Sequence, residues 1–155
     1  MRKVIAALAV VAVVGCSSSS DPTGTKRMNP EILLVQTSSV PTAARHVDSP
    51  LTIHYAMRVA NNSPEAITLK QVTVQSVSEG AYYVTPTSRP YDVTINPNEK
   101  QEVEFWVPAR PGGSIVGANG PVTMRVTCSF DSPTGRFQHI VMQRVNERTS
   151  ITGQQ

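Results

Sequence analysis

Three histidines are the first side chains in this sequence that could bind a metal ion or act as a general base: His46, His54 and His139. A zinc site needs several His, Cys or carboxylate ligands at short, recognisable spacings. None of the three histidines has such a ligand at one of these spacings. The sequence therefore predicts no metal site and no cofactor, and we expect each histidine at the surface or at the core boundary.

Nucleophilic and acid–base catalysis would also need a recognisable set of groups. The sequence contains neither Gly-x-Ser-x-Gly nor Ser-x-x-Lys, the motifs that mark two kinds of serine nucleophile. Glu102 and Glu104 are two residues apart and should share one face of a strand. Beside Lys100 we expect them to form a solvated face that protects a strand edge. A hydrolase would require His54 or His139 to meet a Ser and an acid in one cleft, and we predict no catalytic residue.

A glycine-rich segment from residue 108 to residue 121 contains four of the nine glycines of the chain. It lacks the Gly-Lys-Ser/Thr ending and the following helix that are typical of a phosphate-binding loop. Long loops often carry binding functions. We therefore name Arg110, Ile115, Val116 and Asn119 as candidate partner-binding residues.

Aromatic side chains give a second candidate surface. A regular strand would turn Trp106, the only tryptophan, outward as a binding anchor. We expect it instead to cover the end of the domain or to face the core through a bulge at Pro108. Exposed Tyr82, Tyr83 and Tyr91 could join Trp106 in an aromatic platform for a sugar.

The N-terminus has the pattern of a secretory signal. Arg2 and Lys3 precede an unbroken apolar run from residue 4 to residue 14, which ends at Gly15-Cys16. At about 1.5 Å per residue this run would span roughly half of a ~30 Å hydrocarbon core, so it is too short for a transmembrane helix.

The segment Val13-Val14-Gly15-Cys16 resembles the lipobox of bacterial lipoproteins. The resemblance implies cleavage between Gly15 and Cys16, lipidation of the Cys16 thiol, and a membrane partner for the lipid. Ser17 stands where an inner-membrane retention signal would have Asp, which implies the outer membrane. We expect the domain on its periplasmic face, in the cell envelope.

The totals are compatible with one domain. The chain has 155 residues and a formal net charge of +3, and removal of residues 1–15 would take two basic residues with it. No basic cluster is longer than Lys26-Arg27, so nucleic-acid binding is not expected. If Cys16 carries a lipid, Cys128 has no disulfide partner, and its strand parity predicts a buried, inert thiol.

The chain divides into four parts. Residues 1–15 are the signal peptide, and residues 16–30 are the lipidated cysteine and a flexible linker with a reach of roughly 20 Å. Residues 31–145 form the folded domain, and residues 146–155 are expected to be a disordered tail.

Alternating apolar residues predict strands throughout the folded domain. In the segment 66–77 the apolar parity changes, which predicts a bulge near Lys70-Gln71. The other expected strands lie near residues 32–36, 51–59, 81–85, 91–95, 103–107, 122–130 and 136–144.

Short strands separated by turns favour an all-β, antiparallel sandwich of about seven strands. The stretch from Leu51 to Leu69 and the hairpin from Ile95 to Trp106 resemble bacterial immunoglobulin-like and fibronectin type III-like domains. A small β-barrel is the alternative fold. The resemblance and the signal together imply a non-enzymatic, lipid-anchored binding or structural module. Its partner would be an envelope protein or a glycan, and the alternative is a carbohydrate-binding or enzyme-accessory domain.

Overall fold

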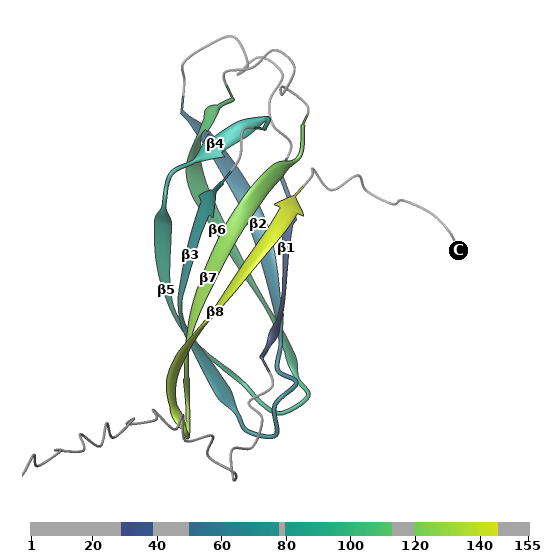
Figure 1. Cartoon of the computed structure of the whole chain (residues 1–155), viewed down its shortest axis with the longest axis vertical. Coiled ribbons are helices and arrows are strands. Elements are labelled where there is room, and N and C mark those ends of the chain that lie inside the picture. Colours follow the sequence, from purple (N-terminus) through teal and green to yellow (C-terminus); the bar gives the residue numbers. More distant parts are fainter. Residues whose placement is uncertain (1–28, 39–49, 78–79, 113–119, 146–155) are drawn as a thin grey trace, which may run out of the picture.

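The computed structural model describes residues 29–38, 50–77, 80–112 and 120–145. These residues form eight antiparallel strands in two sheets of four (Figure 1). The strands are β1 (Glu31–Gln36), β2 (Leu51–Ala60), β3 (Ile67–Ser76), β4 (Tyr82–Val84), β5 (Thr87–Ile95), β6 (Lys100–Pro111), β7 (Val122–Ser132) and β8 (Gly135–Val145).

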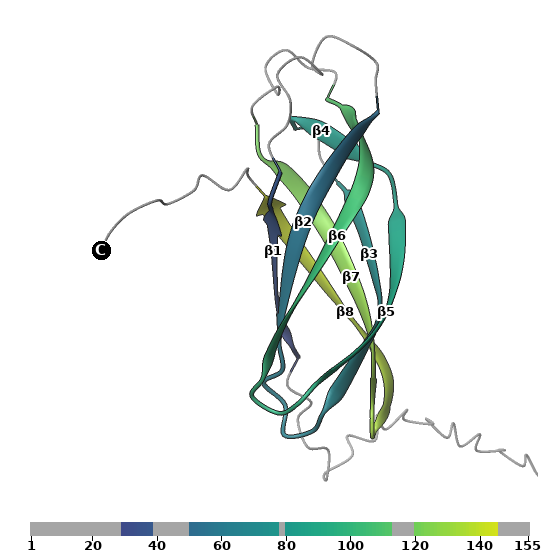
Figure 2. The same cartoon turned by 180° about the vertical axis from the view of Figure 1, so that it is seen from behind.

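The two sheets pack face to face. Sheet A has the order β1-β2-β6-β4, and sheet B has the order β5-β3-β7-β8. Sheet B is in front in Figure 1, and sheet A is in front in Figure 2. The all-β, antiparallel, two-sheet architecture is confirmed. The pairing does not join the described strands into one closed barrel. The described strands number eight because the segment expected at residues 81–85 forms the short β4.

The core lies between the sheets because alternate residues of each strand point inward. In β6, Val103, Phe105 and Val107 are buried while the residues between them are exposed. Each fully buried side chain of this size stabilises the fold by about 1.5–3 kcal/mol relative to its exposed state. The largest buried side chains include Tyr55, Tyr82, Phe130, Leu34, Ile53 and Met57.

The predicted break in β3 is confirmed as a shift of register between Leu69 and Gln71. It lets Leu69 and Val72, which differ in parity, both face the core. Pro90 of β5 lies opposite Gln71. Because proline has no N–H, it belongs at an edge strand or a bulge, and here it is at both.

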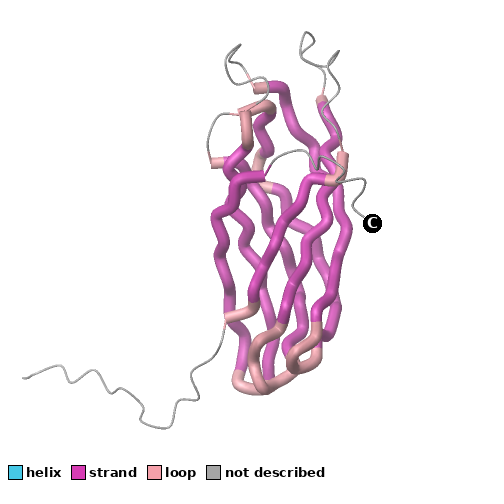
Figure 3. Tube along the Cα trace, turned by 90° about the vertical axis from the view of Figure 1, so that its right-hand side faces the viewer, coloured by secondary structure: helices cyan, strands magenta, loops and turns pink. Residues whose placement is uncertain are grey.

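One end of the molecule is closed by turns around Asn61. Its buried side-chain amide donates hydrogen bonds to the carbonyls of Glu65 and Ile95, and its oxygen accepts one from the Ser63 N–H. The next turn uses Asn98 at φ 61°, a conformation that Asn tolerates better than most residues. Figure 3 shows these turns at the lower end of the molecule.

The described chain begins and ends at opposite ends of the molecule. Glu31 pairs with Ala60, next to the Asn61 turns, and this is where β1 starts. The last residue of β8, Val145, pairs with Val122 at the upper end of the view in Figure 1. The first residue of β2, Leu51, also lies at this upper end.

Side chains tie the edges of the two sheets together. The amide of Gln143 on β8 accepts a hydrogen bond from the Leu34 N–H at 3.0 Å and donates one to the Leu34 carbonyl at 2.8 Å. On the other side, the Ser76 hydroxyl of β3 accepts a hydrogen bond from the Val84 N–H at 2.9 Å. β1 and β4 are the two edge strands of sheet A. The Gln143 and Ser76 side chains form the hydrogen bonds that a further strand would otherwise make at these edges.

Candidate functional site

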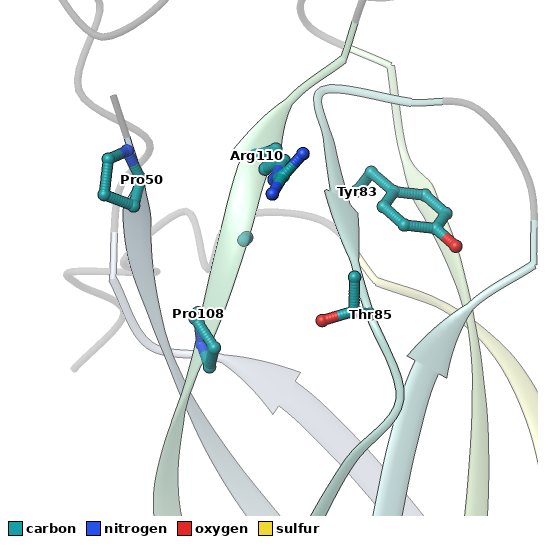
Figure 4. Close-up of a pocket in the computed structure, with 6 residues that line it drawn as sticks. Pro50, Tyr83, Thr85, Pro108 and Arg110 are labelled. Carbon is teal, nitrogen blue, oxygen red and sulfur yellow. The ribbon is translucent and has the colours of Figure 1, made fainter. Parts of the chain in front are cut away.

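A shallow hollow of about 210 Å³ lies at the upper end of sheet A. Figure 4 shows Pro50 and Pro108 on one side, Tyr83 and Thr85 on the other, and Arg110 between them. These residues come from the start of β2, from β4 and the residue after it, and from β6, so strands distant in sequence build the walls. The complete described lining is Pro50, Tyr83, Thr85, Pro108, Ala109 and Arg110.

The hollow opens where β4 leaves sheet A. Arg89 donates a hydrogen bond to the Trp106 carbonyl at 3.1 Å, so the backbone of Trp106 faces away from β2. Two residues further, Pro108 faces the same way in an antiparallel ladder and offers no N–H to a neighbour. The pairing of β4 stops at Val84, opposite Ala109. Pro108, which has no N–H to donate, therefore lies beside the point where the chain leaves β4 and crosses to β5 in sheet B.

Trp106 corrects one sequence-based expectation. Its strand continues without a bulge to Pro111, so the ring faces outward from sheet A and is 50% exposed. The Arg89 guanidinium lies over the ring, 4.4 Å from its centroid, in a cation–π contact. Trp106 neither faces the core nor lies at the end of the domain, where we had expected it.

The predicted four-residue aromatic platform is divided by the fold. Tyr83 is 48% exposed and borders the hollow, and Tyr82, the next residue on β4, is only 1% exposed and belongs to the core. Tyr91 is half-buried and packs against the core from β5, where burial raises the pKa of its hydroxyl. Tyr82 and Tyr91 are therefore not platform residues, and only Tyr83 and Trp106 expose their rings on the outer face of sheet A.

Tyr82 instead belongs to a buried hydrogen-bond chain. Its hydroxyl is 2.6 Å from that of Tyr55 and donates to the side-chain oxygen of Gln36 at 2.7 Å. The Gln36 amide in turn donates to the Ser38 carbonyl. Burial raises the pKa of Tyr82 to about 12 and, with the neighbouring Tyr82 charge, raises that of Tyr55 further. Both hydroxyls therefore stay protonated at ordinary pH and serve structure.

The four candidate loop residues are not brought together by the part of the chain that the structure describes. Arg110 lies on β6 and lines the hollow. Ile115, Val116 and Asn119 lie outside the described residues. Two described glycines, Gly112 and Gly120, flank residues 113–119, and both form a backbone hydrogen bond with Ala81, the residue before β4. The Gly112 N–H donates to the Ala81 carbonyl, and the Ala81 N–H donates to the Gly120 carbonyl.

The two described histidines, His54 and His139, lie on different sheets. His54 is exposed on the outer face of sheet A, opposite Trp106. His139 is half-buried on β8, opposite Cys128, and His46 lies outside the described residues. Within residues 29–38, 50–77, 80–112 and 120–145, no three His, Cys, Asp or Glu side chains gather closely enough to hold a metal ion.

The other sequence candidates lie where their strand parity predicts. Glu102 and Glu104 are exposed on the outer face of β6, and Glu102 forms an ion pair with Arg58 at 3.2 Å. Cys128 is buried, its thiol lies 3.7 Å from the sulfur of Met57, and burial raises its pKa to about 12. A thiol with so little thiolate is a poor nucleophile.

The candidate cleavage and lipidation residues, Gly15 and Cys16, lie outside the described residues. The search for a helix that is long and apolar enough to cross a membrane found none in the described segments.

Sequence reasoning missed most of the hollow. Pro50 and Thr85 carry no signal of their own, because only the pairing of distant strands brings them together. Pro108 did carry one: a proline inside an alternating strand pattern marks a position without a neighbouring strand. We interpreted Pro108 as the site of a bulge, but β6 is regular at this position, and the neighbouring strand β4 ends beside it.

One comparison with solved structures supports the fold. No family model matches the sequence, and no curated protein matches it. A crystal structure of a Bordetella pertussis protein provisionally named ApaA is similar, with a TM-score of 0.51 and 13% identity over 79% of this chain and 94% of that one.

Two further structures are more weakly similar. A Northeast Structural Genomics Consortium target has a TM-score of 0.49 at 14% identity, covering 82% of this chain and 92% of its own. A protein from Archaeoglobus fulgidus has a TM-score of 0.46 at 11% identity, covering 74% and 91%. At this level of identity the likeness to the Bordetella protein extends to the all-β, two-sheet fold and no further.

Proposed function

We propose that this chain is a lipid-anchored, non-enzymatic binding module of the bacterial cell envelope, with a sandwich of the immunoglobulin-like or fibronectin type III-like class. The apolar signal and the Cys16 motif support the anchor. The position of Ser17 supports the outer membrane as its site, with the domain on the periplasmic side. The proposal includes no catalytic step.

One observation carries the binding role. Tyr83 is a half-exposed aromatic ring beside the cationic Arg110 in a hollow with rigid proline walls. Tyr and Arg are over-represented among residues that dominate binding energy. The hollow lies at the end of the domain opposite Glu31, where the chain arrives from Cys16. On an anchored protein, this end would point away from the membrane, towards a partner.

The anchor is tested by replacing its thiol. We expect the full-length chain to incorporate labelled palmitate and to fractionate with outer membranes, and we expect Cys16→Ser to lose both properties. Cys128→Ser is the matched control and should keep them. Palmitate incorporation that survives Cys16→Ser would refute the anchor.

The binding role is tested by affinity purification from crosslinked envelopes. We expect a defined envelope partner with the wild-type chain and at least about tenfold less of it with Tyr83→Ser, since a hot-spot residue contributes about 2 kcal/mol or more and tenfold needs about 1.4 kcal/mol. Leu33→Ser is the control, because Leu33 is also an exposed apolar residue on the outer face of sheet A. Equal recovery with Tyr83→Ser and wild type would exclude the hollow as the working surface.

A glycan is the alternative partner, in a carbohydrate-binding or enzyme-accessory domain. The observation in its favour is that Tyr83 and Trp106 both expose their rings on the outer face of sheet A. Tyr83 pairs with Arg110, four residues along β6 from Trp106, or about 13 Å at ~3.3 Å per residue. Two rings at that spacing could contact two non-adjacent units of one polysaccharide chain. Retention of the protein on purified envelope polysaccharide, lost in Trp106→Ala, would favour this alternative.

A further inference from the structure

We propose that the hollow binds a carboxylate group attached to a compact apolar body or ring. This inference rests on the binding role proposed above and names the chemical class of the ligand. The charge, the donor groups and the size of the hollow support it.

The charge of the hollow is positive and uncompensated within the part of the chain that the structure describes. Arg110 is the one charged residue among the described side chains of the lining. Two other strand arginines form ion pairs, Arg58 with Glu102 and Arg136 with Asp131, whereas the described residues place no carboxylate within 4.0 Å of Arg125 or Arg144. Arg110 has no carboxylate within 4.0 Å among the described residues. Its planar guanidinium is suited to hold a carboxylate through two parallel hydrogen bonds.

The remaining polar groups of the lining point to the same ligand. Pro50 and Pro108 have no N–H, so these two walls provide no backbone donor. In the antiparallel ladder, the backbone N–H and C=O of Ala109 point towards β2, and those of Arg110 point towards Tyr83 on β4. Neither residue therefore offers its backbone groups to a ligand. The side-chain groups left to meet a ligand are the Arg110 guanidinium and the Thr85 hydroxyl, both of which can donate. Figure 4 shows the Tyr83 hydroxyl directed away from Arg110, so Tyr83 contributes its ring. A ligand rich in acceptor oxygens fits this set.

A single positive charge favours a carboxylate over a phosphate monoester. The monoester carries about −1.5 to −2 charges at neutral pH, and one arginine would leave part of that charge uncompensated. A carboxylate carries one charge and is matched by Arg110 alone.

The apolar surface and the size define the rest of the ligand. The proline rings, Ala109 and the exposed ring of Tyr83 provide apolar contact beside the guanidinium. The volume of about 210 Å³ exceeds the ~150 Å³ that accommodates benzene and is below the ~300 Å³ of a typical drug-sized site. One amino-acid residue or one sugar ring fills such a space. The carboxylate can therefore come from a peptide or from an acidic sugar.

The test compares matched acidic and neutral probes on the full-length protein by NMR titration. N-acetylproline and N-acetylprolinamide represent the peptide source, and glucuronate and glucose represent the sugar source. We expect at least one acid to bind about tenfold or more tightly than its neutral counterpart, because a hydrogen bond to a charged group is roughly twice as strong as a neutral one. The acid that binds identifies the source of the carboxylate.

Arg110→Gln should abolish the preference for the acid. Arg144→Gln should keep it, because it removes the same charge from an exposed position on β8 of the other sheet. Equal binding of acid and neutral probes, the absence of binding by every probe, or a preference that survives Arg110→Gln would each overturn the proposal.

The purification experiment separates this proposal from the binding role. If Tyr83→Ser loses the envelope partner while Arg110→Gln retains it fully, the hollow is the working surface and its ligand is not a carboxylate. If neither substitution affects recovery, the binding role itself fails.

Discussion

Adjacent residues on β4 have opposite roles. Tyr83 exposes its ring beside the hollow, while Tyr82 places its hydroxyl in the core, between the Tyr55 hydroxyl and the side-chain oxygen of Gln36. The alternation of a strand alone produces this difference. A buried hydroxyl must keep its partners, because an unsatisfied polar group in the core costs about 1–3 kcal/mol.

Tyr82→Phe should therefore destabilise the protein more than Tyr55→Phe. The Tyr82 hydroxyl contacts both Tyr55 and Gln36, so its loss leaves the Gln36 oxygen without its donor. Loss of the Tyr55 hydroxyl leaves that bond intact. We expect a decrease in the free energy of unfolding of about 1–3 kcal/mol for Tyr82→Phe and of about 0.5–1.5 kcal/mol for Tyr55→Phe, measured by urea denaturation. The reverse order would show that the hydroxyl chain is arranged differently.

At this scale, the sequence predicts which residues of one strand share a face. The parity of Val103, Phe105 and Val107 placed Trp106 outward, and the structure agrees with the parity rather than with the bulge that we inferred from Pro108. The strand expected at residues 81–85 already contained both Tyr82 and Tyr83. Grouping them in one exposed platform was wrong because two neighbours on a strand point to opposite faces.

The Gln143 contact with β1 acts at the scale of an element. β1 is an edge strand of six residues paired only with β2 in sheet A, and an edge strand presents unpaired backbone groups. The Gln143 amide satisfies the N–H and the carbonyl of Leu34 together. One side chain of sheet B thus holds an edge of sheet A.

Gln143→Ala should loosen β1 in particular. We expect a loss of about 1–2 kcal/mol in the free energy of unfolding, from two hydrogen bonds, and faster hydrogen exchange at the Leu34 amide. Gln138→Ala is the matched control on the same strand, because Gln138 makes one exposed 3.3 Å bond to the Ser129 hydroxyl; it should change stability by less than about 0.5 kcal/mol. Equal effects of the two substitutions would show that the contact with β1 contributes no stability.

Strands could be predicted from the sequence, and their partners could not. Even the bulge at Lys70-Gln71 was visible as a change of parity, because a bulge acts within one strand. The contact between Gln143 and Leu34 joins residues 109 positions apart. No local pattern contains such a pair, and the hollow depends on the same long-range pairing of β2, β4 and β6.

Three weak acids are buried in the described part of the molecule, Tyr55, Tyr82 and Cys128, and their burial affects its response to alkali. Burial raises the pKa of Tyr82 from 10 to about 12 and that of Cys128 from 9 to about 12, and it raises that of Tyr55 as well. Below pH 9 these groups are protonated in both the folded and unfolded states and do not affect stability. Above their unfolded pKa values the unfolded chain loses protons that the folded chain keeps, so stability falls as pH rises.

The free energy of unfolding should therefore decrease from about pH 9, and more steeply above about pH 10, by up to about 1.4 kcal/mol per pH unit for each group. Urea denaturation between pH 7 and 11, with tyrosine ionisation followed by ultraviolet absorbance, measures this. In Cys128→Ala the decrease should begin about one pH unit later. A free energy of unfolding that stays constant up to pH 11 would contradict the burial of these groups.

The position of β1 has a mechanical consequence. The described chain enters at Glu31, at one end of β1, and the hollow lies at the other end of the domain. A pull between an N-terminal anchor and a partner in the hollow would run along the strands. Such a pull loads the six residue pairs between β1 and β2 together, in shear, rather than one after another, and the Gln143 amide adds two bonds that resist the same sliding. The arrangement of β1 is therefore suited to resist tension applied along the strands.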